Sequence, residues 1–259
     1  MKQALNALLF AMLTCIGNVA FAGMPAVSYT YALGFDFFFS WHPNQFNRSE
    51  VVFESPEELQ KLYAHCQMGK PVFDLLAGSK NKCSIDISKT EKGDANWDSA
   101  MIEILGTPKY TGGSPAFGLF STTELPAAKW QQRPADERER SAIQQLLSAA
   151  KNPNWPDPHS LNINSAWVVF LPDAAVRTYF VPGSQINESF YDATRHHVFT
   201  STGGVFRYQG EISDKPIHYV NSGRDDSPLV VTNEDCDGLC VELWSLSSGT
   251  KTIATFGGH

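Results

Sequence analysis

The second half of the chain alternates short apolar runs with turn-forming residues. Pairs such as Pro182-Gly183 and Gly203-Gly204 separate runs that are rich in valine, phenylalanine and leucine. Strand-sized apolar runs divided by turns at intervals of about 8 to 12 residues predict an antiparallel meander, barrel or sandwich. The predicted strands cover residues 166–171, 176–181, 197–200, 205–209, 217–220, 229–232, 239–246 and 252–256.

The first half contains two stretches with the spacing of amphipathic helices. One helix is predicted from Ser55-Pro56-Glu57-Glu58 to about residues 66–69. Serine can cap a helix, proline suits its first position, and acidic residues complement the positive end of the helix dipole. A second helix is predicted over residues 134–150, where apolar residues recur every three or four positions and Pro134 would occupy the first turn.

Seven aromatic residues lie between Tyr29 and Trp41, and their alternation predicts a strand with one buried face. We expect these rings to form core, and an exposed platform for sugar or peptide is the alternative. Short strands are also expected at residues 84–87 and 117–120. The apolar pattern of residues 98–105 fits either a strand or a helix.

These elements predict an α+β fold, with a mixed N-terminal half that carries two helices and a largely antiparallel C-terminal half. The expected regions are residues 23–160, which mix helix and strand, and residues 161–259, which are mainly antiparallel β. Three prolines within residues 152–159 make that segment the expected joint between them. The alternative is a single continuous domain.

The first 22 residues have the layout of a secretory signal peptide. Lys2 gives a positive start, residues 5–16 form an apolar run, and Ala20-Phe21-Ala22 supplies a small-residue cleavage site. The run is shorter than the ~20 residues that span a bilayer. We therefore expect cleavage after Ala22 and a periplasmic or secreted protein. Lipid attachment at Cys15 is the weaker alternative, because a small residue does not precede it.

Charge and hydropathy narrow the classes of partner. The chain carries 20 basic and 27 acidic residues, which gives a formal net charge of −7. A nucleic-acid-binding protein normally presents a strong basic patch, and an anionic membrane would repel a negative chain. We expect no nucleic-acid partner and no membrane span, and a protein or a saccharide as the ligand.

Four cysteines remain after the predicted cleavage: Cys66, Cys83, Cys236 and Cys240. An even number in an exported chain predicts two disulfides, for which three pairings exist. The most economical pairing joins Cys66 to Cys83 and Cys236 to Cys240, because the members of each pair are close in sequence. A zinc site or a reactive thiol would be unusual in an oxidising compartment.

A calcium-loop-like pattern begins at Asn233. Asn233, Asp235 and Asp237 place oxygen ligands at alternate positions, and Gly238 follows at the sixth position. Glu242 could close a calcium site, although it stands at the tenth position and an EF-hand needs an acid at the twelfth. The competing interpretation is an acidic β-turn held by a Cys236–Cys240 disulfide.

No catalytic signature was found in the sequence. It has no G-x-S-x-G, H-E-x-x-H or phosphate-binding glycine loop, and His196 and His197 would face opposite sides of a strand. We therefore expect a binding or interaction protein, such as an inhibitor or accessory factor. One alternative is an extracellular hydrolase of polysaccharide or peptide, with Trp130 and Trp155 as stacking surface and unassigned acids. The other is a calcium-stabilised structural module.

Overall fold

The computed structural model describes eleven stretches of the chain. They are residues 28–32, 36–41, 48–53, 55–86, 98–105, 117–126, 128–150, 152–183, 195–222, 227–233 and 239–258. The predicted signal peptide, residues 1–22, lies outside them, so export stays a prediction. Among the described residues, no helix combines the length and the apolar character needed to cross a membrane.

The described residues form two sheets and two α-helices. One sheet has eleven strands in the order β13-β14-β15-β16-β1-β3-β6-β5-β4-β7-β2. Its strands are β1 (Ser28–Ala32), β2 (Phe37–Trp41), β3 (Arg48–Phe53), β4 (Val72–Asp74), β5 (Ser79–Asp86), β6 (Asp98–Leu105), β7 (Phe117–Ser121), β13 (Pro216–Asn221), β14 (Pro228–Asn233), β15 (Leu239–Ser245) and β16 (Lys251–Gly258).

The second sheet has five strands in the order β12-β11-β10-β9-β8, all antiparallel. Its strands are β8 (Gln131–Pro134), β9 (Trp167–Phe170), β10 (Val176–Pro182), β11 (His196–Thr202) and β12 (Val205–Ile212). The helices are α2 (Pro56–Gln67) and α3 (Glu137–Ala149), with short 3-10 turns η2 (Pro158–Ser160) and η3 (Ile163–Ser165) after α3.

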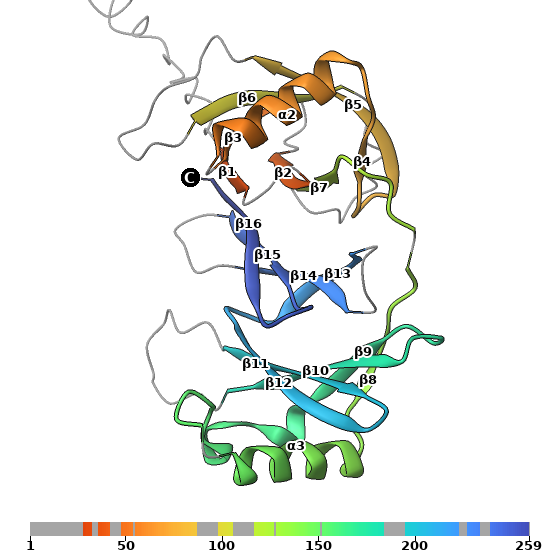
Figure 1. Ribbon diagram of the computed structural model, residues 1–259, viewed down its shortest axis with the longest axis vertical. Helices are drawn as coiled ribbons and strands as arrows, with labels where there is room; N and C mark the ends of the chain where they lie inside the picture. Colours follow the sequence, from red (N-terminus) through yellow and green to blue (C-terminus); the bar gives the residue numbers. More distant parts are fainter. Residues whose placement is uncertain are drawn as a thin grey trace, which may run out of the picture.

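The large sheet curls on itself at one end of the molecule. Strand β2, at the end of the strand order, returns against β1, β3 and β16, so that β1–β7 form a nearly closed barrel. Strands β13–β16 extend from the barrel toward the five-stranded sheet (Figure 1). All pairings in the large sheet are antiparallel except that of β1 with β3.

Strand β14 shows how the layers stack. Val231 faces a core that contains Phe39 of β2, whereas Val230 faces a second core that contains Trp167 and Phe180 of the five-stranded sheet. Successive residues of a strand point to opposite faces. The extension β13–β16 is therefore buried between the barrel and the five-stranded sheet, and α3 covers the far face of the latter (Figure 1).

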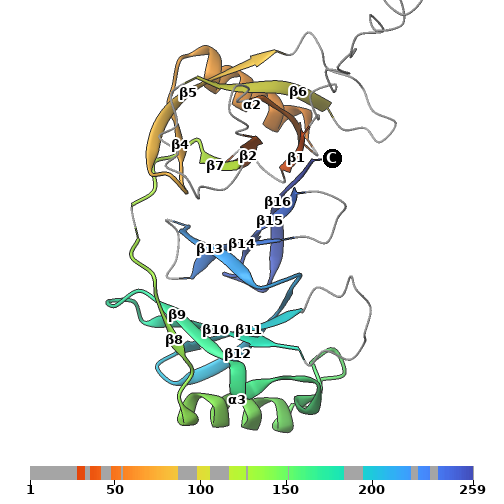
Figure 2. The ribbon, with the colours of Figure 1, turned by 180° about the vertical axis from the view of Figure 1, so that it is seen from behind.

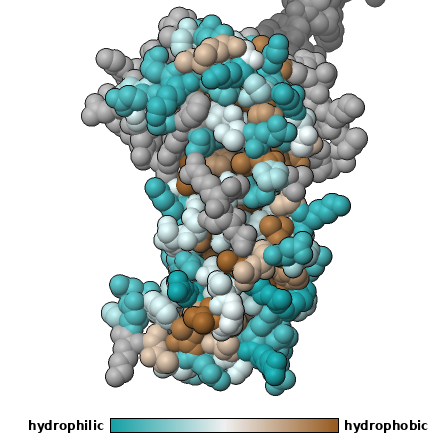
Figure 3. Space-filling view, turned by 45° about the vertical axis from the view of Figure 1, so that its right-hand side comes forward, coloured by the Kyte–Doolittle hydropathy of each residue, from teal (hydrophilic) through white to brown (hydrophobic). Residues whose placement is uncertain are grey.

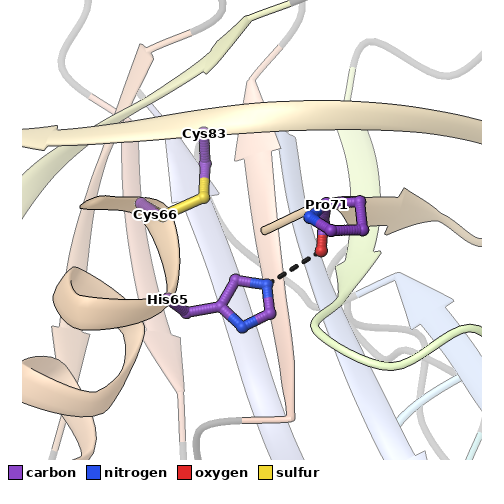
Figure 4. The surroundings of a disulfide bond; sticks show 4 residues. All are labelled: His65, Cys66, Pro71 and Cys83. Atoms are coloured by element: carbon purple, nitrogen blue, oxygen red, sulfur yellow. Dashed lines mark hydrogen bonds between the residues drawn. A yellow bond between two sulfur atoms is a disulfide. The ribbon is translucent and has the colours of Figure 1, made fainter. Parts of the chain in front are cut away.

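Helix α2 packs on the barrel through Leu59 and Leu62, and a disulfide holds its end (Figure 4). Cys66, in the last turn, is bonded to Cys83 of β5, with 5.1 Å between their Cα atoms. Nε2 of His65 lies 2.8 Å from the carbonyl oxygen of Pro71, which can only accept. The predicted Cys66–Cys83 bond is confirmed.

Helix α3 begins at Glu137, after its N-cap Asp136, rather than at Pro134. Pro134 is the last residue of β8, so its predicted place in the first helical turn is wrong. The side chain of Asp136 accepts a hydrogen bond from the Glu139 amide, and the Glu139 side chain accepts one from the Asp136 amide. This capping box fixes the start of the helix.

The structure confirms the predicted α+β class and most of the predicted strands. Each of the eight segments expected in the second half overlaps with one of the strands β9–β16, and residues 117–120 lie in β7. Residues 98–105 form strand β6 rather than a helix. The aromatic N-terminal segment forms two strands, β1 and β2, rather than one, and residues 33–35 between them are outside the described stretches.

The chain passes from the large sheet to the five-stranded sheet after β7, and the described residues 122–126 and 128–130 run along the side of the molecule (Figure 2). It returns to the large sheet between β12 and β13. The expected joint at residues 152–159 lies against the five-stranded sheet with most of its residues exposed, and the division of the chain at this joint stays a prediction. There Trp155 packs against Tyr208 of β12, with ring centroids 5.4 Å apart.

Figure 3 shows mostly hydrophilic residues over the barrel end and apolar residues at the waist and below.

Candidate functional site

The first turn of α3 carries a buried carboxylate, Glu139, which accepts four hydrogen bonds. Arg133 of β8 donates two of them at 2.7 Å, one to each carboxylate oxygen. The Asp136 amide donates a third at 2.8 Å and the Tyr179 hydroxyl of β10 a fourth at 3.0 Å. A guanidinium that binds a carboxylate through two parallel bonds makes one of the stronger polar contacts in proteins.

These contacts set the protonation states of the Glu139 carboxyl group and the Tyr179 hydroxyl group. Burial alone would raise the pKa of Glu139, but the hydrogen bonds from Arg133, Asp136 and Tyr179 outweigh burial and lower the pKa from 4.5 to about 2. Burial, and then the charge of Glu139, raise the pKa of Tyr179 well above 10. Near neutral pH the carboxylate is charged and the phenol is neutral, so neither is suited to general acid–base catalysis.

Arg177 of β10 forms an ion pair at the edge of this cluster. Its Nη1 lies 3.6 Å from Oε1 of Glu139, and its guanidinium stacks on the Phe170 ring, 5.1 Å from the ring centroid. Arg133 approaches the same ring at 5.8 Å. Among the described residues, the Arg177 side chain donates no hydrogen bond, so its donors are available to a ligand.

A pocket of about 540 Å³ opens in front of Arg177. We call it the Arg177 pocket, and its lining residues are Arg138, Glu139, Ala142, Ala174, Ala175, Arg177, Tyr179, Ser201, Gly203, Gly204 and Phe206. Helix α3, the β9–β10 turn and the β11–β12 hairpin supply them. Arg138 adds a second guanidinium, and Phe206 adds an aromatic wall. The pocket therefore combines two cations with one carboxylate that is already neutralised.

A larger cleft of about 690 Å³ lies between the β4–β5 hairpin, residues 124–126 with Ala128, and the end of β13. Two acidic residues from different segments line it, Asp74 and Glu124. One carboxylate oxygen of Asp74 accepts hydrogen bonds from the amides of Leu76 and Ala77 at 3.0 and 3.1 Å. Asp74 thus shapes the hairpin turn, whereas Glu124 is exposed.

The residues of the predicted calcium loop are only partly described. Asp235 and Asp237 lie outside the described residues. Asn233 ends β14, and Glu242 pairs with Thr232 rather than with Asn233. Paired residues of antiparallel strands share a face and successive residues alternate, so the Asn233 and Glu242 side chains point to opposite faces. These two side chains do not meet, and the calcium loop stays a prediction.

Glu242 takes part in a different contact. Its carboxylate accepts a hydrogen bond from the Ser213 hydroxyl, which also lies 3.0 Å from Oγ1 of Thr232. Trp244 donates to the same Thr232 oxygen at 3.0 Å. Burial raises the pKa of Glu242, and the hydrogen bond from Ser213 opposes that rise. This network joins the β12–β13 turn to β14 and β15.

The structure describes only one of the two cysteines of the second predicted disulfide. Cys240 is buried at the start of β15 and is disulfide-bonded. Cys236 lies outside the described residues, so the Cys236–Cys240 pairing stays a prediction.

The histidine pair of β11 lies as the strand pattern predicted. His196 faces the layer between the sheets, where its ring is 5.3 Å from that of Trp167. His197 faces the α3 side, and its Nδ1 is 3.0 Å from the Tyr208 hydroxyl. Burial lowers the pKa of His197.

The sequence analysis did not single out Arg133, Glu139, Arg177 or Tyr179. The sequence does contain a signal for Glu139, because an aspartate at 136 followed three residues later by a glutamate is a capping-box pattern. The contact between Tyr179 and Glu139 spans 40 positions and carries no local signal.

Comparisons with known proteins found no relative: no family model, no curated protein and no solved structure matches the chain.

Proposed function

We propose that this chain is an exported binding protein that takes an acidic saccharide in the Arg177 pocket. One observation carries the proposal: Arg138 and Arg177 flank a cavity whose single lining carboxylate, Glu139, is already saturated by its own partners. Guanidinium groups are suited to carboxylate, sulfate and phosphate groups because they can donate two parallel hydrogen bonds.

The distribution of charge supports an anionic ligand at this place. The chain as a whole has a net charge of −7, but residues 127–215, which contain the pocket, hold nine basic and nine acidic residues. The negative excess therefore lies in residues 1–126 and 216–259. An anion that approaches the five-stranded sheet meets less repulsion than elsewhere on the protein.

The pocket also has the mixed lining of a small-ligand site. Phe206 presents a partly exposed ring, and Ser201 adds a hydroxyl to the two cations. Small-ligand sites typically combine aromatic walls with a few polar groups that fix orientation. An acidic sugar, with a ring to lie on the wall and a carboxylate or sulfate for the arginines, fits this combination.

Two observations support export of the chain. The pattern of residues 1–22 is that of a secretory leader, and the Cys66–Cys83 disulfide is compatible with an oxidising compartment.

The test is titration calorimetry of the chain lacking residues 1–22 with galacturonate oligosaccharides, and with neutral galactose oligosaccharides as the uncharged reference. We expect binding of the acidic sugar alone. Arg177→Gln should weaken it about 10- to 100-fold, because one charged hydrogen-bonding partner contributes about 1.5–3 kcal/mol. Arg207→Gln, which removes an exposed arginine of β12 outside the pocket, is the matched control. Equal binding by wild type and Arg177→Gln, or no binding of acidic sugars, contradicts the proposal.

A hydrolase is the second candidate function, and the cleft with Asp74 and Glu124 is the observation that favours it. Two carboxyl groups on one cleft are the minimum for glycoside hydrolysis. We expect Glu124→Gln to abolish any turnover of polysaccharide, while Glu58→Gln, a change on α2 outside the cleft, leaves it intact. If the wild-type chain turns over no polysaccharide or peptide, this candidate is excluded.

A further inference from the structure

A second cavity lies on the opposite face of the five-stranded sheet, at the end of the layer between the two sheets. It measures about 450 Å³, and we call it the Trp167 pocket. Its lining residues are Gln132, Arg133, Pro134, Ser165, Trp167, Pro182, His196 and Lys215. Strands β8, β9, β10 and β11 and the β12–β13 turn supply most of them. None of these lining residues is acidic, although the chain as a whole is negative.

The indole of Trp167 is held in a fixed orientation. It stacks on Phe180, with ring centroids 5.4 Å apart and planes at 20°, and its Nε1 donates to the Tyr219 hydroxyl at 3.1 Å. The ring of His196 meets it edge-on at 67°. Trp167 is buried, with 8% of its surface exposed, so a ligand meets only the part of the indole that lines the pocket. Because three aromatic neighbours already hold the ring, a ligand need not order it on binding, which lowers the entropic cost.

The positive charge of the pocket belongs chiefly to Lys215. Its Nζ stands over the Trp167 ring, 6.0 Å from the centroid. Among the described residues, no carboxylate forms an ion pair with this ammonium group. Arg133 also lines the pocket, but Glu139 neutralises it. Lys215 is therefore the cation that remains for a ligand.

The remaining lining indicates an aromatic ligand rather than a sugar. Pro134 and Pro182 add apolar walls, and the polar side chains without a permanent charge are Ser165, Gln132 and His196. A sugar carries several hydroxyl groups, each of which needs a partner when it is buried. A flat aromatic ring needs apolar walls and an aromatic side chain to pack against.

We infer that the Trp167 pocket binds a small aromatic carboxylate, whose ring lies against Trp167 and the two prolines and whose carboxylate pairs with Lys215. The inference does not depend on the Arg177 pocket, because that cavity opens on the other face of the sheet and shares no lining residue with this one.

The experiment measures binding of 4-hydroxyphenylacetate and of its uncharged amide to the chain lacking residues 1–22, by calorimetry and by NMR of the tryptophan indole N–H signals. Wild type should bind the acid about tenfold or more tightly than the amide, which corresponds to one charge-assisted contact. Lys215→Gln should remove this preference. Both compounds should perturb the Trp167 signal, which Trp167→Phe identifies among the six tryptophans.

Two controls separate this site from others. Lys80→Gln changes another exposed lysine that stands over an aromatic ring, 5.7 Å from the centroid of Phe73, and should keep the wild-type preference. Arg177→Gln should also keep it, so that failure of the Arg177 pocket and failure of this inference remain distinguishable. Equal affinity of wild type for acid and amide, an unchanged preference in Lys215→Gln, or no saturable binding would overturn the inference.

Discussion

Each of the two helices packs on one part of the molecule, but different interactions hold the two helices in place. Helix α2 has no side-chain hydrogen bond at its N-cap, Ser55, and its other end is tied to β5 by the Cys66–Cys83 disulfide. Helix α3 has no covalent tie among the described residues, and its first turn is held by the hydrogen bonds and charges around Glu139. The barrel helix is therefore anchored at its end and the other at its start.

This difference has a consequence for function. A disulfide does not respond to pH over the range where carboxylates titrate, whereas the Glu139 cluster does. The candidate Arg177 pocket lies at the helix that is held by charge. Stability of the barrel should depend on oxidation, and order of the pocket should depend on the charge of Glu139.

The largest expected effect is loss of the disulfide. The bond closes a loop with a sequence separation of 17, and removing such a link costs about 3 kcal/mol in the chain-entropy description. We expect the double variant Cys66→Ala/Cys83→Ala to lose about that much free energy of unfolding in urea denaturation. Reduced wild type should lose at least as much, because reduction also breaks the disulfide of Cys240. An unchanged denaturation midpoint of the double variant would contradict the assigned role.

The next effect comes from Glu139. Glu139→Gln keeps the size of the side chain but leaves Arg133 without a charged partner, and we expect a loss of about 2 kcal/mol. Glu137→Gln is the matched control, because Glu137 is an exposed acid of the same helical turn and should cost less than about 1 kcal/mol. Equal losses for the two variants would show that the cluster contributes only through the helix dipole.

The pH dependence of the unfolding free energy distinguishes the Glu139 cluster from the Cys66–Cys83 disulfide. The pKa of Glu139 is lowered from 4.5 to about 2 on folding, so its stabilising contribution is complete above pH 4.5 and is lost as the pH falls toward 2. The difference in unfolding free energy between wild type and Glu139→Gln should therefore shrink over this window. The difference between wild type and the cysteine variant should stay constant, as measured by denaturation at several pH values.

The comparison of the helices also shows what the sequence could predict. Strand-sized apolar runs divided by turn residues identified the strands of the second half, because a strand buried on both faces, such as β14 or β11, has a nearly continuous apolar sequence. The Cys66–Cys83 pairing followed from proximity in the chain. Both inferences use residues that are neighbours in sequence, where local pattern and final structure agree.

The Arg177 pocket could not be predicted in the same way. Arg133, Glu139 and Arg177 come from three elements, and only the order β10-β9-β8 with α3 packed on it brings them together. The pairing of β1 with β16 joins the two ends of the described chain and likewise has no local signal. Strand order depends on packing between distant segments, which one sequence does not display.

An effect of similar size to that of Glu139→Gln is expected where the two sheets meet. Gly210 of β12 has a φ of +130°, and a Cβ added there would overlap Oγ1 of Thr250, whose amide donates to Gln209 at 2.9 Å. Gly210→Ala should cost about 2 kcal/mol through strain and overpacking. Gly78→Ala is the control, because Gly78 also has a positive φ but open space around it, and should cost about 1 kcal/mol. If thermal denaturation gives equal losses of stability for the two variants, the Thr250 side chain moves to make room for the added methyl group.

The smallest effect compares the two helix starts directly. Asp136→Ala removes the side chain that accepts the Glu139 amide at 2.9 Å, and a lost N-cap costs about 1 kcal/mol. Ser55→Ala removes a hydroxyl that donates to Glu57 and caps no backbone amide, so we expect a change of only a few tenths of a kcal/mol. Urea denaturation of both variants checks the difference. If Ser55→Ala costs as much as Asp136→Ala, helix α2 is also held at its start, and the contrast between a covalent and a polar anchor fails.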